Sequence, residues 1–401
     1  MRKLLLSLTL VVAFPVHAHV FAADWPNFLG PNYDCTSPET GINIQWDKTP
    51  PKMLWKVPMG DRGYAGPAVA KGKLFIIDRK GNDDIVRAIN IETGKDVWNF
   101  SYPDPARYNY GFAQATPTID GGKLYTMSRR GLLHCLTAED GKKVWDVNII
   151  KRFSGKTAAW EMAISPRIDG DRIIVCPGGR DATVAVLDKK TGETIWQGGG
   201  NDRPGYATPV VATIEGKKQY IVFTSVSLIG VDAANGKLLW TYPWRVQYDV
   251  NATTPIVSGD EILISSSYGK GSALLRLKDN RPAAVWQNKT MQSHFSTPIL
   301  RSGRIYGSTT TGRMVCLDWK TGETLWQTRG FERGGVVGVA GTIIALDGER
   351  GSITMFKLAD DRWQQVGRLA GLGGQSWTAP IVADGKLIVR NKEQLACYSL
   401  K

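Results

Sequence analysis

The stretch Val186–Trp196, VLDKKTGETIW, decides the fold of this chain. It reads as a short apolar strand, a turn closed by glycine, and a second strand that reaches a tryptophan. Cys316–Trp326, CLDWKTGETLW, repeats it almost residue for residue. Tryptophans at the same place in the pattern, two of them in degenerate copies, recur 40–51 residues apart: Trp55, Trp98, Trp145, Trp196, Trp240, Trp286 and Trp326. An internal repeat of this length is typical of four-stranded structural units.

A second marker opens each unit. It consists of a small residue, a proline, an apolar run and a glycine turn, which together read as two strands joined by a hairpin. The copies begin at Gly66-Pro67, Thr116-Pro117, Ser165-Pro166, Thr208-Pro209, Thr254-Pro255, Thr297-Pro298 and Ala379-Pro380, with one copy that lacks the proline at Val336-Val337. Eight starts predict an all-β, eight-bladed β-propeller of four-stranded antiparallel blades with little helix.

The two ends of the repeat region are offset. The unit that starts at Pro380 has room for only three strands, whereas Trp55 ends a fourth-strand pattern with no strands before it. We therefore expect an N-terminal strand at about residues 52–57 to complete the C-terminal blade and close the ring. An open solenoid is the alternative, but it would need no such offset and would require capping repeats.

The N-terminus reads as a secretory signal peptide. Arg2 and Lys3 precede an apolar run, and small residues follow it. We expect cleavage after Ala22, with Ala23 as the near alternative, and a membrane anchor as the competing interpretation. The expected organisation is a signal peptide at 1–22, an N-terminal extension at 23–50 and the propeller at 51–401. Export would place the protein in the periplasm or outside the cell.

The composition limits the possible partners. The chain has 401 residues with a net charge of +13, which favours anionic envelope ligands or anionic protein surfaces. No nucleic-acid motif occurs, and no second stretch is long enough to span a membrane. Three of the five cysteines, Cys135, Cys316 and Cys397, share one strand position and are expected to be small buried hydrophobes. No cluster of cysteine and histidine has the spacing of metal ligands.

The segments Val186–Trp196 and Cys316–Trp326 resemble the pyrroloquinoline-quinone (PQQ) type propeller repeat. The resemblance covers roughly 51–400, and Trp25–Asn32 is similar to the leader of many exported members. The family includes quinoprotein alcohol dehydrogenases, and also the propeller lipoprotein of the outer-membrane assembly machinery, which acts as a scaffold and binds no quinone. The resemblance therefore implies the fold but leaves the function open.

The enzyme interpretation implies a PQQ cofactor and a calcium ion held by Glu, Asn and a catalytic Asp. Glu161 and Asn251 could serve as metal ligands, with Asp249 nearby, but the following loop, 292–295, contains no aspartate. The adjacent cysteine pair of the dehydrogenases and the Cys-x-x-Cys-His motif of a haem domain are also missing from the sequence. The catalytic position is thus the part of the match that fails.

The loops that lead into the eight first strands should converge on one channel mouth. Trp160, Trp377 and Arg333 are the candidates for contact with a cofactor or similar ligand there. The candidates for partner binding are Arg62, Tyr64, Gln114, Tyr206, Asn251, His294, Phe295 and Gln375. The alternative is that these side chains plug the channel and hydrogen-bond to one another. A lone histidine such as His294 is more often structural than an acid–base catalyst.

These patterns favour an exported propeller that acts as a non-catalytic binding or scaffold protein in the cell envelope, with no cofactor. The alternative is a PQQ- and calcium-dependent oxidoreductase similar to alcohol dehydrogenases. The repeated tryptophans do not favour the enzyme, because their position in outer strands predicts packing between neighbouring blades.

Overall fold

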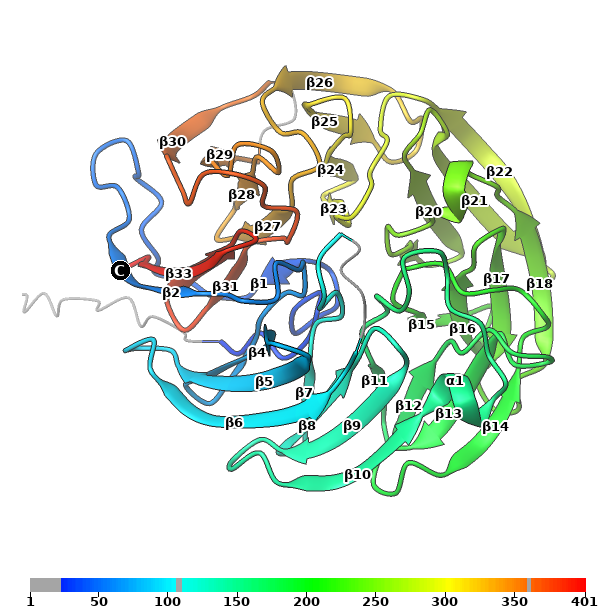
Figure 1. Cartoon of the computed structure of the whole chain (residues 1–401). Coiled ribbons are helices and arrows are strands. Elements are labelled where there is room, and N and C mark those ends of the chain that lie inside the picture. Colours follow the sequence, from blue (N-terminus) through cyan, green and yellow to red (C-terminus); the bar gives the residue numbers. More distant parts are fainter. Residues whose placement is uncertain (1–22, 106–109, 359–361) are drawn as a thin grey trace, which may run out of the picture.

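The computed structural model describes residues 23–105, 110–358 and 362–401. Within these ranges eight small sheets surround a central channel (Figure 1). The eight-bladed, all-β propeller predicted from the repeats is therefore confirmed. Helix is confined here to α1 (Ile149–Arg152) and the 3₁₀ turn η1 (Gln247–Asp249). No helix in the described part of the chain has the length and apolar character needed to cross a membrane. The predicted signal peptide, 1–22, lies outside the described residues.

Each blade runs from an inner strand beside the channel to an outer strand on the circumference (Figure 1). Blade 1 consists of β3 (Ala68–Ala70), β4 (Lys73–Lys80), β5 (Asp83–Asn90) and β6 (Asp96–Pro103), and blade 2 of β7 (Thr118–Asp120), β8 (Lys123–Met127), β9 (Leu132–Thr137) and β10 (Lys143–Asn148). Blade 3 consists of β11 (Arg167–Asp169), β12 (Arg172–Val175), β13 (Val184–Asp188) and β14 (Thr194–Gly198), and blade 4 of β15 (Val210–Ile214), β16 (Lys217–Phe223), β17 (Ser227–Asp232) and β18 (Leu238–Pro243). Blade 5 consists of β19 (Ile256–Ser258), β20 (Glu261–Ser266), β21 (Gly271–Lys278) and β22 (Arg281–Asn288), and blade 6 of β23 (Ile299–Arg301), β24 (Arg304–Ser308), β25 (Arg313–Asp318) and β26 (Thr324–Arg329). Blade 7 consists of β27 (Val336–Val339), β28 (Thr342–Leu346), β29 (Ile353–Lys357) and β30 (Gln365–Leu369), and blade 8 of β31 (Ile381–Ala383), β32 (Lys386–Arg390), β33 (Gln394–Ser399) and β2 (Met53–Pro58).

The ring closes through its two ends. Strand β2 pairs antiparallel with β33, with Met53 opposite Tyr398 and Trp55 opposite Cys397. It is therefore the outer strand of blade 8, as the offset of the sequence repeat predicts. The observed strand, Met53–Pro58, differs from the expected 52–57 by one residue at each end.

Neighbouring blades are joined by a tryptophan that packs on a glycine. A Cβ atom on Gly192, whose φ is +73°, would lie 2.7 Å from Cε3 of Trp145 in the preceding blade, so only glycine leaves room for the indole. Trp145 Nε1 donates to the carbonyl of Lys189 at 3.2 Å, which anchors the ring. The same arrangement joins Trp55 to Gly94, Trp98 to Gly141, Trp196 to Gly236 and Trp286 to Gly322. The Gly-x-x-x-Trp repeat therefore encodes both sides of a blade-to-blade contact.

Two tryptophans pack against a neighbouring blade whose turn offers them no glycine. The turns before the outer strands of blades 5 and 7 contain no glycine in the sequence. Trp240 instead donates from Nε1 to Gln219 Oε1 at 2.7 Å and packs among apolar side chains of blades 4 and 5. Trp326 packs edge-on against Phe356 of blade 7. The contact between blades is thus retained where its sequence signature is lost.

A β-bulge lies at the same place in each outer strand, and it precedes the tryptophan in the seven outer strands that have one. In β10, for example, the register shifts between Lys143 and Trp145, so Val144 turns outward and is 45% exposed. The opposite strand position, in the third strand, carries the cysteines. Cys135 lies opposite Trp145, and Cys316 and Cys397 face their own blade's tryptophan in the same way. All five cysteines are buried and free, which confirms that these three are small core residues.

The N-terminal extension enters the channel. Trp25 exchanges two backbone hydrogen bonds with Val69 of blade 1, at 2.9 and 2.7 Å, and Ile119 of blade 2 donates to the carbonyl of Pro26 at 2.8 Å. Strand β1 (Thr36–Ser37) then adds in parallel to β27, the inner strand of blade 7. In Figure 1 it lies close to the centre of the ring. This segment is therefore a plug that occupies the channel between inner strands.

The remainder of the extension clamps blades 7 and 8 together. Asp47 N donates to the carbonyl of Val366 in blade 7, and Asn43 N donates to the carbonyl of Leu400 beside blade 8. Trp46 is almost fully buried in the core cluster that both blades share, and it lies against Gly367. Blade 7 has no repeat tryptophan, so Trp46 supplies the missing aromatic at this junction.

Candidate functional site: the channel mouth

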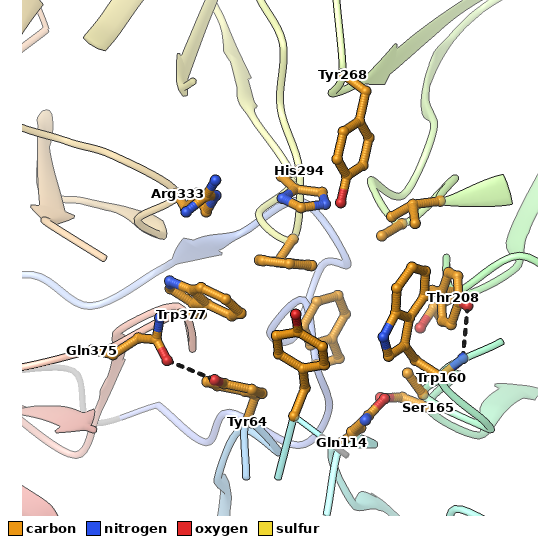
Figure 2. A pocket seen from close by; sticks show the side chains of 17 residues that line it. Tyr64, Gln114, Trp160, Ser165, Thr208, Tyr268, His294, Arg333, Gln375 and Trp377 are labelled. Atoms are coloured by element: carbon orange, nitrogen blue, oxygen red, sulfur yellow. Dashed lines mark hydrogen bonds between the residues drawn. The ribbon is translucent and has the colours of Figure 1, made fainter. Parts of the chain in front are cut away.

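One face of the propeller carries a cavity of about 410 Å³, which falls within the range of sites for small ligands or anchoring side chains (Figure 2). All eight connections to the inner strands contribute to it, as the sequence analysis expected. Its lining comprises Phe28, Tyr64, Tyr110, Gln114, Trp160, Ala163, Ser165, Tyr206, Thr208, Val250, Ala252, Tyr268, His294, Phe295, Arg333, Gln375 and Trp377. We call this set of residues the mouth.

Most of the candidates named from the sequence meet in the mouth. Nine of them line it: Tyr64, Gln114, Trp160, Tyr206, His294, Phe295, Arg333, Gln375 and Trp377. Figure 2 shows Trp160 and Trp377 on opposite sides of the pocket, with His294 and Gln114 at its other two edges. Whether these side chains bind a ligand stays a prediction.

Eight lining residues are not among the sequence candidates, and two of these eight lie outside the loops that lead into the inner strands. Phe28 comes from the plug, which has no counterpart in the repeat. Tyr268 comes from the β20–β21 turn within blade 5, where its φ of +55° is unusual for a tyrosine. An exposed aromatic at a left-handed turn position would have been a usable signal, because such a position otherwise favours glycine or asparagine.

Four rings form a continuous run on one side of the mouth. His294 and Phe295 have ring centroids 3.6 Å apart, Phe295 stacks on Trp377 at 4.9 Å, and Trp377 stacks on Tyr64 at 4.9 Å. Tyr64 Oη donates to Gln375 Oε1 at 2.8 Å. Trp377 is thus already stacked with two side chains, and a planar cofactor would have to compete with them.

Trp160 has a different environment. Its ring contacts with Tyr110, Tyr206 and Tyr248 are tilted or edge-on, at centroid distances of 6.1–6.3 Å. Its backbone N–H donates to Tyr206 Oη at 3.1 Å, and burial raises the pKa of Tyr206 to about 12. None of the described ring contacts of Trp160 is a parallel stack. The tyrosines therefore act as walls around an indole.

His294 is the buried polar group of the mouth. It is only 7% exposed, and neither ring nitrogen has a hydrogen-bond partner among the described residues. Burial, with a further contribution from the positive charge of Arg333, lowers the pKa of His294 to about 3. The imidazole is therefore neutral at physiological pH, with one donor and one acceptor that no described residue satisfies.

The guanidinium group of Arg333 is paired with two carboxylates. Its Nη1 lies 3.1 Å from Glu349 Oε1 and 3.5 Å from Glu332 Oε1. The same Glu349 oxygen accepts a hydrogen bond from Trp377 Nε1 at 2.9 Å. Arg333 and Trp377 are thus held in place through a shared carboxylate, which positions the cation at the edge of the mouth.

Two predicted partner-binding residues do not line the cavity. Arg62 is exposed, with a φ of +47°. Asn251 is fully buried, and its side-chain amide is hydrogen-bonded to the protein. Its Nδ2 donates to the carbonyls of Thr224 and Trp244 at 2.9 and 3.1 Å, and its Oδ1 accepts from Ser266 Oγ at 2.7 Å. Asn251 therefore holds its loop in shape, the structural role that the sequence analysis kept as its alternative.

The donor set does not fit the calcium site of a quinoprotein. The side chain of Glu161 forms an ion pair at 2.7 Å with the buried Arg129, and Asp249 pairs with Arg203 at 3.1 Å. The amide oxygen of Asn251 is taken by Ser266. Among the described residues no group of three or more His, Cys, Asp or Glu side chains could hold a metal ion. The residues expected to bind calcium are thus committed to protein contacts.

Two kinds of characterised protein share the repeat. The outer membrane protein assembly factor BamB of Escherichia coli is 22% identical over 338 residues, which cover 82% of each chain. The same factor of Yersinia pestis is 21% identical over 304 residues, covering 70% of this chain and 72% of that one. The quinone-dependent alcohol dehydrogenase subunit of Gluconacetobacter polyoxogenes is 28% identical over 160 residues, but the match covers only 36% of this chain and 21% of the subunit.

Solved structures agree on the fold. BamB from Moraxella catarrhalis superposes with a TM-score of 0.65 at 18% identity, covering 87% of this chain and 99% of that one. Quinohemoprotein alcohol dehydrogenase from Comamonas testosteroni gives a TM-score of 0.64 at 13% identity, covering 94% and 80%. Two proteins with different activities are thus about equally similar in backbone, so this likeness shows the fold alone.

A family model provides the assignment. The model described as outer membrane protein assembly factor BamB matches residues 82–328, which is more than half of the chain. The match lies within the repeats identified from the sequence. This chain therefore belongs to the family of PQQ-like repeat propellers described by the outer membrane protein assembly factor BamB.

Proposed function

We propose that this protein is a non-catalytic, exported scaffold whose mouth binds a segment of another envelope protein. Its family, and the relatives named as assembly factors that it matches over more than two thirds of their length, support a role in building the cell envelope. The mouth supports binding, because it is a preformed concave surface rich in tyrosine and tryptophan with a compensated arginine at its edge. Residues of these types dominate the energetics of protein interfaces.

The distribution of exposed hydrophobic side chains carries the proposal. Among the described residues the exposed large aromatics are Tyr110, Tyr248 and Tyr268, at 55%, 58% and 41% exposure. Tyr110 and Tyr268 line the mouth, and Tyr248 lies beside it, edge-on against Trp160 and Tyr268. The exposed aliphatic side chains lie instead on outer strands, spread around the circumference: Met53, Leu54, Val97, Val144, Ile195, Leu238 and Val285. Burying a cluster of aromatics against a partner yields far more binding energy than covering isolated aliphatic residues.

The chemistry of the mouth supports a binding role over catalysis. A general base works best with a pKa near the operating pH, and the pKa of His294 lies far below it. Glu161, Asp249 and Glu349 are tied up in ion pairs with arginines. The net charge of +13 would favour an acidic partner and speed its approach.

Site-specific photo-crosslinking in the exporting host would test this function. A photoreactive amino acid would replace Tyr110, Tyr248 or Tyr268 one at a time, and Val144 or Ile195 in control variants with similarly exposed side chains on the circumference. We expect the three aromatic positions to capture the same envelope protein and the two control positions to capture none. Trp160→Ala should abolish the capture from Tyr248, because Trp160 supports that ring. Equal capture from both regions, or none from the mouth, would contradict the proposal.

A further inference from the structure

Glu39 is a buried carboxylate that has no cationic side chain beside it. The residue is 1% exposed, and its side chain forms no ion pair within the described residues. Its contacts are backbone N–H groups: Gly385 N donates to Oε1 at 3.1 Å and to Oε2 at 2.9 Å, and Ala23 N lies 3.1 Å from Oε1. Burial raises the pKa of Glu39. An ionised carboxylate in this position is costly unless a positive charge compensates it.

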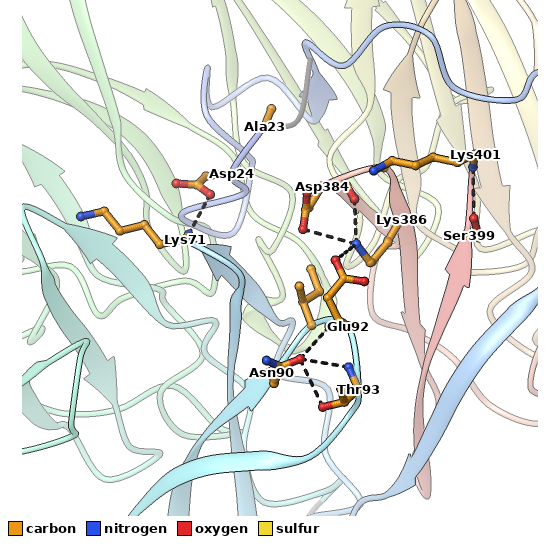
Figure 3. A network of polar contacts seen from close by, with 12 residues as sticks. Ala23, Asp24, Lys71, Asn90, Glu92, Thr93, Asp384, Lys386, Ser399 and Lys401 are labelled. Atoms are coloured by element: carbon orange, nitrogen blue, oxygen red, sulfur yellow. Dashed lines mark hydrogen bonds and ion pairs between the residues drawn. The ribbon is translucent and has the colours of Figure 1, made fainter. Parts of the chain in front are cut away.

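The chain immediately after the predicted cleavage site is held firmly at this place. The carbonyl of Ala23 accepts from Asp384 N at 3.2 Å, and Asp24 Oδ1 accepts from Lys71 N at 3.0 Å. Trp25 is then fixed to Val69 by two backbone hydrogen bonds. Figure 3 shows Ala23 beside Asp384, with Asp24 directed toward blade 1. The nitrogen of Ala23 is therefore held beside Glu39 by the contacts of Ala23 itself and of the two residues that follow it.

We propose that the chain is processed at the Ala22–Ala23 bond and that the new α-ammonium group of Ala23 forms a buried ion pair with Glu39. Hydrolysis by a leader peptidase consumes one water molecule, breaks the C–N bond, and leaves a carboxylate on Ala22 and an amine on Ala23. That amine takes a proton from solvent, since free α-amino groups have pKa values near 7.7–8.0. The ammonium group replaces an amide N–H at the position already 3.1 Å from the Glu39 carboxylate.

The neighbouring charges favour this arrangement. Asp384 lies beside Glu39, and its negative charge contributes to raising the pKa of Glu39. The nearby Lys386 is engaged with Glu92 at 2.6 Å and with Asp384 Oδ2 at 3.3 Å. An added positive charge at Ala23 thus faces two carboxylates, Glu39 and Asp384. The geometry also decides between the two cleavage sites left open by the sequence, because cleavage after Ala23 would remove the residue that reaches Glu39.

The first measurement is the intact mass of the full chain after export from a bacterial host. We expect an N-terminus at Ala23, and any other N-terminus would overturn the proposal. The second compares the melting temperature, at neutral pH and one scan rate, of a chain that begins at Ala23 with one that carries Gly-Ser before it. The chain that begins at Ala23 should melt about 2 °C or more higher. Equal melting temperatures would overturn the ion pair.

Variants show whether Glu39 is responsible. Glu39→Gln should remove the difference between the two chains, whereas Glu193→Gln, at an exposed turn, should leave it intact. If Glu39→Gln fails to fold, the native residue can be tested by reductive methylation of the α-amine. That amine should react at least tenfold more slowly in the chain that begins at Ala23 than in the extended chain. Equal reaction rates would refute the proposal without any mutation.

Discussion

The tryptophans of the outer strands and those of the mouth show how one residue type serves two purposes. Trp55, Trp98, Trp145, Trp196 and Trp286 pack on a glycine of the next blade, and each indole N–H donates to a carbonyl there. No other blade has a tryptophan at the position of Trp160 or of Trp377, and the neighbours of these two are the aromatic side chains of other loops. The comparison teaches that recurrence marks structure, whereas side chains that occur once in a repeat protein mark the candidate site.

The strongest test of this distinction removes an outer-strand tryptophan. Trp55→Ala deletes a 9% exposed indole that both closes the ring and packs on Gly94. It should destabilise the protein by about 3–5 kcal/mol, the usual cost of truncating a buried aromatic. Chemical denaturation measures the loss, and Trp160→Ala is the matched control in the mouth, with an expected loss of about 1 kcal/mol. Equal losses would break the comparison.

A glycine pair separates the contact from the backbone conformation. Gly94 and Gly72 have φ values of +70° and +73°, but a Cβ on Gly94 would lie 2.8 Å from Trp55, whereas a Cβ on Gly72 meets nothing within 4 Å. Gly72→Ala should therefore cost about 1 kcal/mol of backbone strain. Gly94→Ala should cost about 2–4 kcal/mol, since overpacking against the indole is added. Similar unfolding free energies for the two variants would show that the glycine serves only the turn.

The pH dependence of stability would report on the mouth. The folded-state pKa of His294, about 3, lies below its ordinary value near 6.5, so the unfolded chain binds a proton first as the pH falls. Stability contributed by the neutral imidazole is present above pH 6.5 and is lost toward pH 3. Between pH 7 and pH 5 the loss should be about 2 kcal/mol.

The control for this effect is the variant His294→Gln, which cannot titrate. Its unfolding free energy should fall less than that of the native protein over the same pH range. Comparing the two proteins cancels the contributions of other groups, including His134, whose pKa burial lowers to about 4, and Asp84, whose pKa burial raises to about 7. Parallel pH profiles would mean that His294 is solvated.

The smallest expected effect is that of the quinone. Because the side chains of Glu161 and Asn251 are committed to Arg129 and Ser266, adding PQQ and Ca²⁺ should shift the melting temperature by less than about 1 °C. Absorption spectra after gel filtration should show no stoichiometric quinone, and dye-coupled alcohol oxidation should stay at background. Stoichiometric uptake of the quinone with turnover would instead show that the mouth is a catalytic site and not a partner-binding site.

The fold was predictable because a repeat multiplies every local signal. One weak start, Val336-Val337, was still recognisable as β27 from the spacing of its neighbours. The mouth was predictable only in outline, since topology sends eight loops to one face whatever their sequences. The side chains of Asn251 and Glu161 could not be placed, because their partners, Ser266 and Arg129, lie 15 and 32 positions away and are fixed by packing rather than by spacing. Phe28 was missed because nothing in the repeat predicts a plug.

Pairing of β2 with β33 also sets the order of events when the chain is made. A polypeptide delivered from its N-terminal end presents Met53–Pro58 first, yet the partner of that strand, Gln394–Ser399, arrives last. Until then β2 is an unpaired edge strand with exposed Met53 and Leu54, and such a strand can aggregate or bind a chaperone. The ring can therefore close only after β33 has been made, and a protein truncated before Gln394 would leave β2 as an unpaired edge strand.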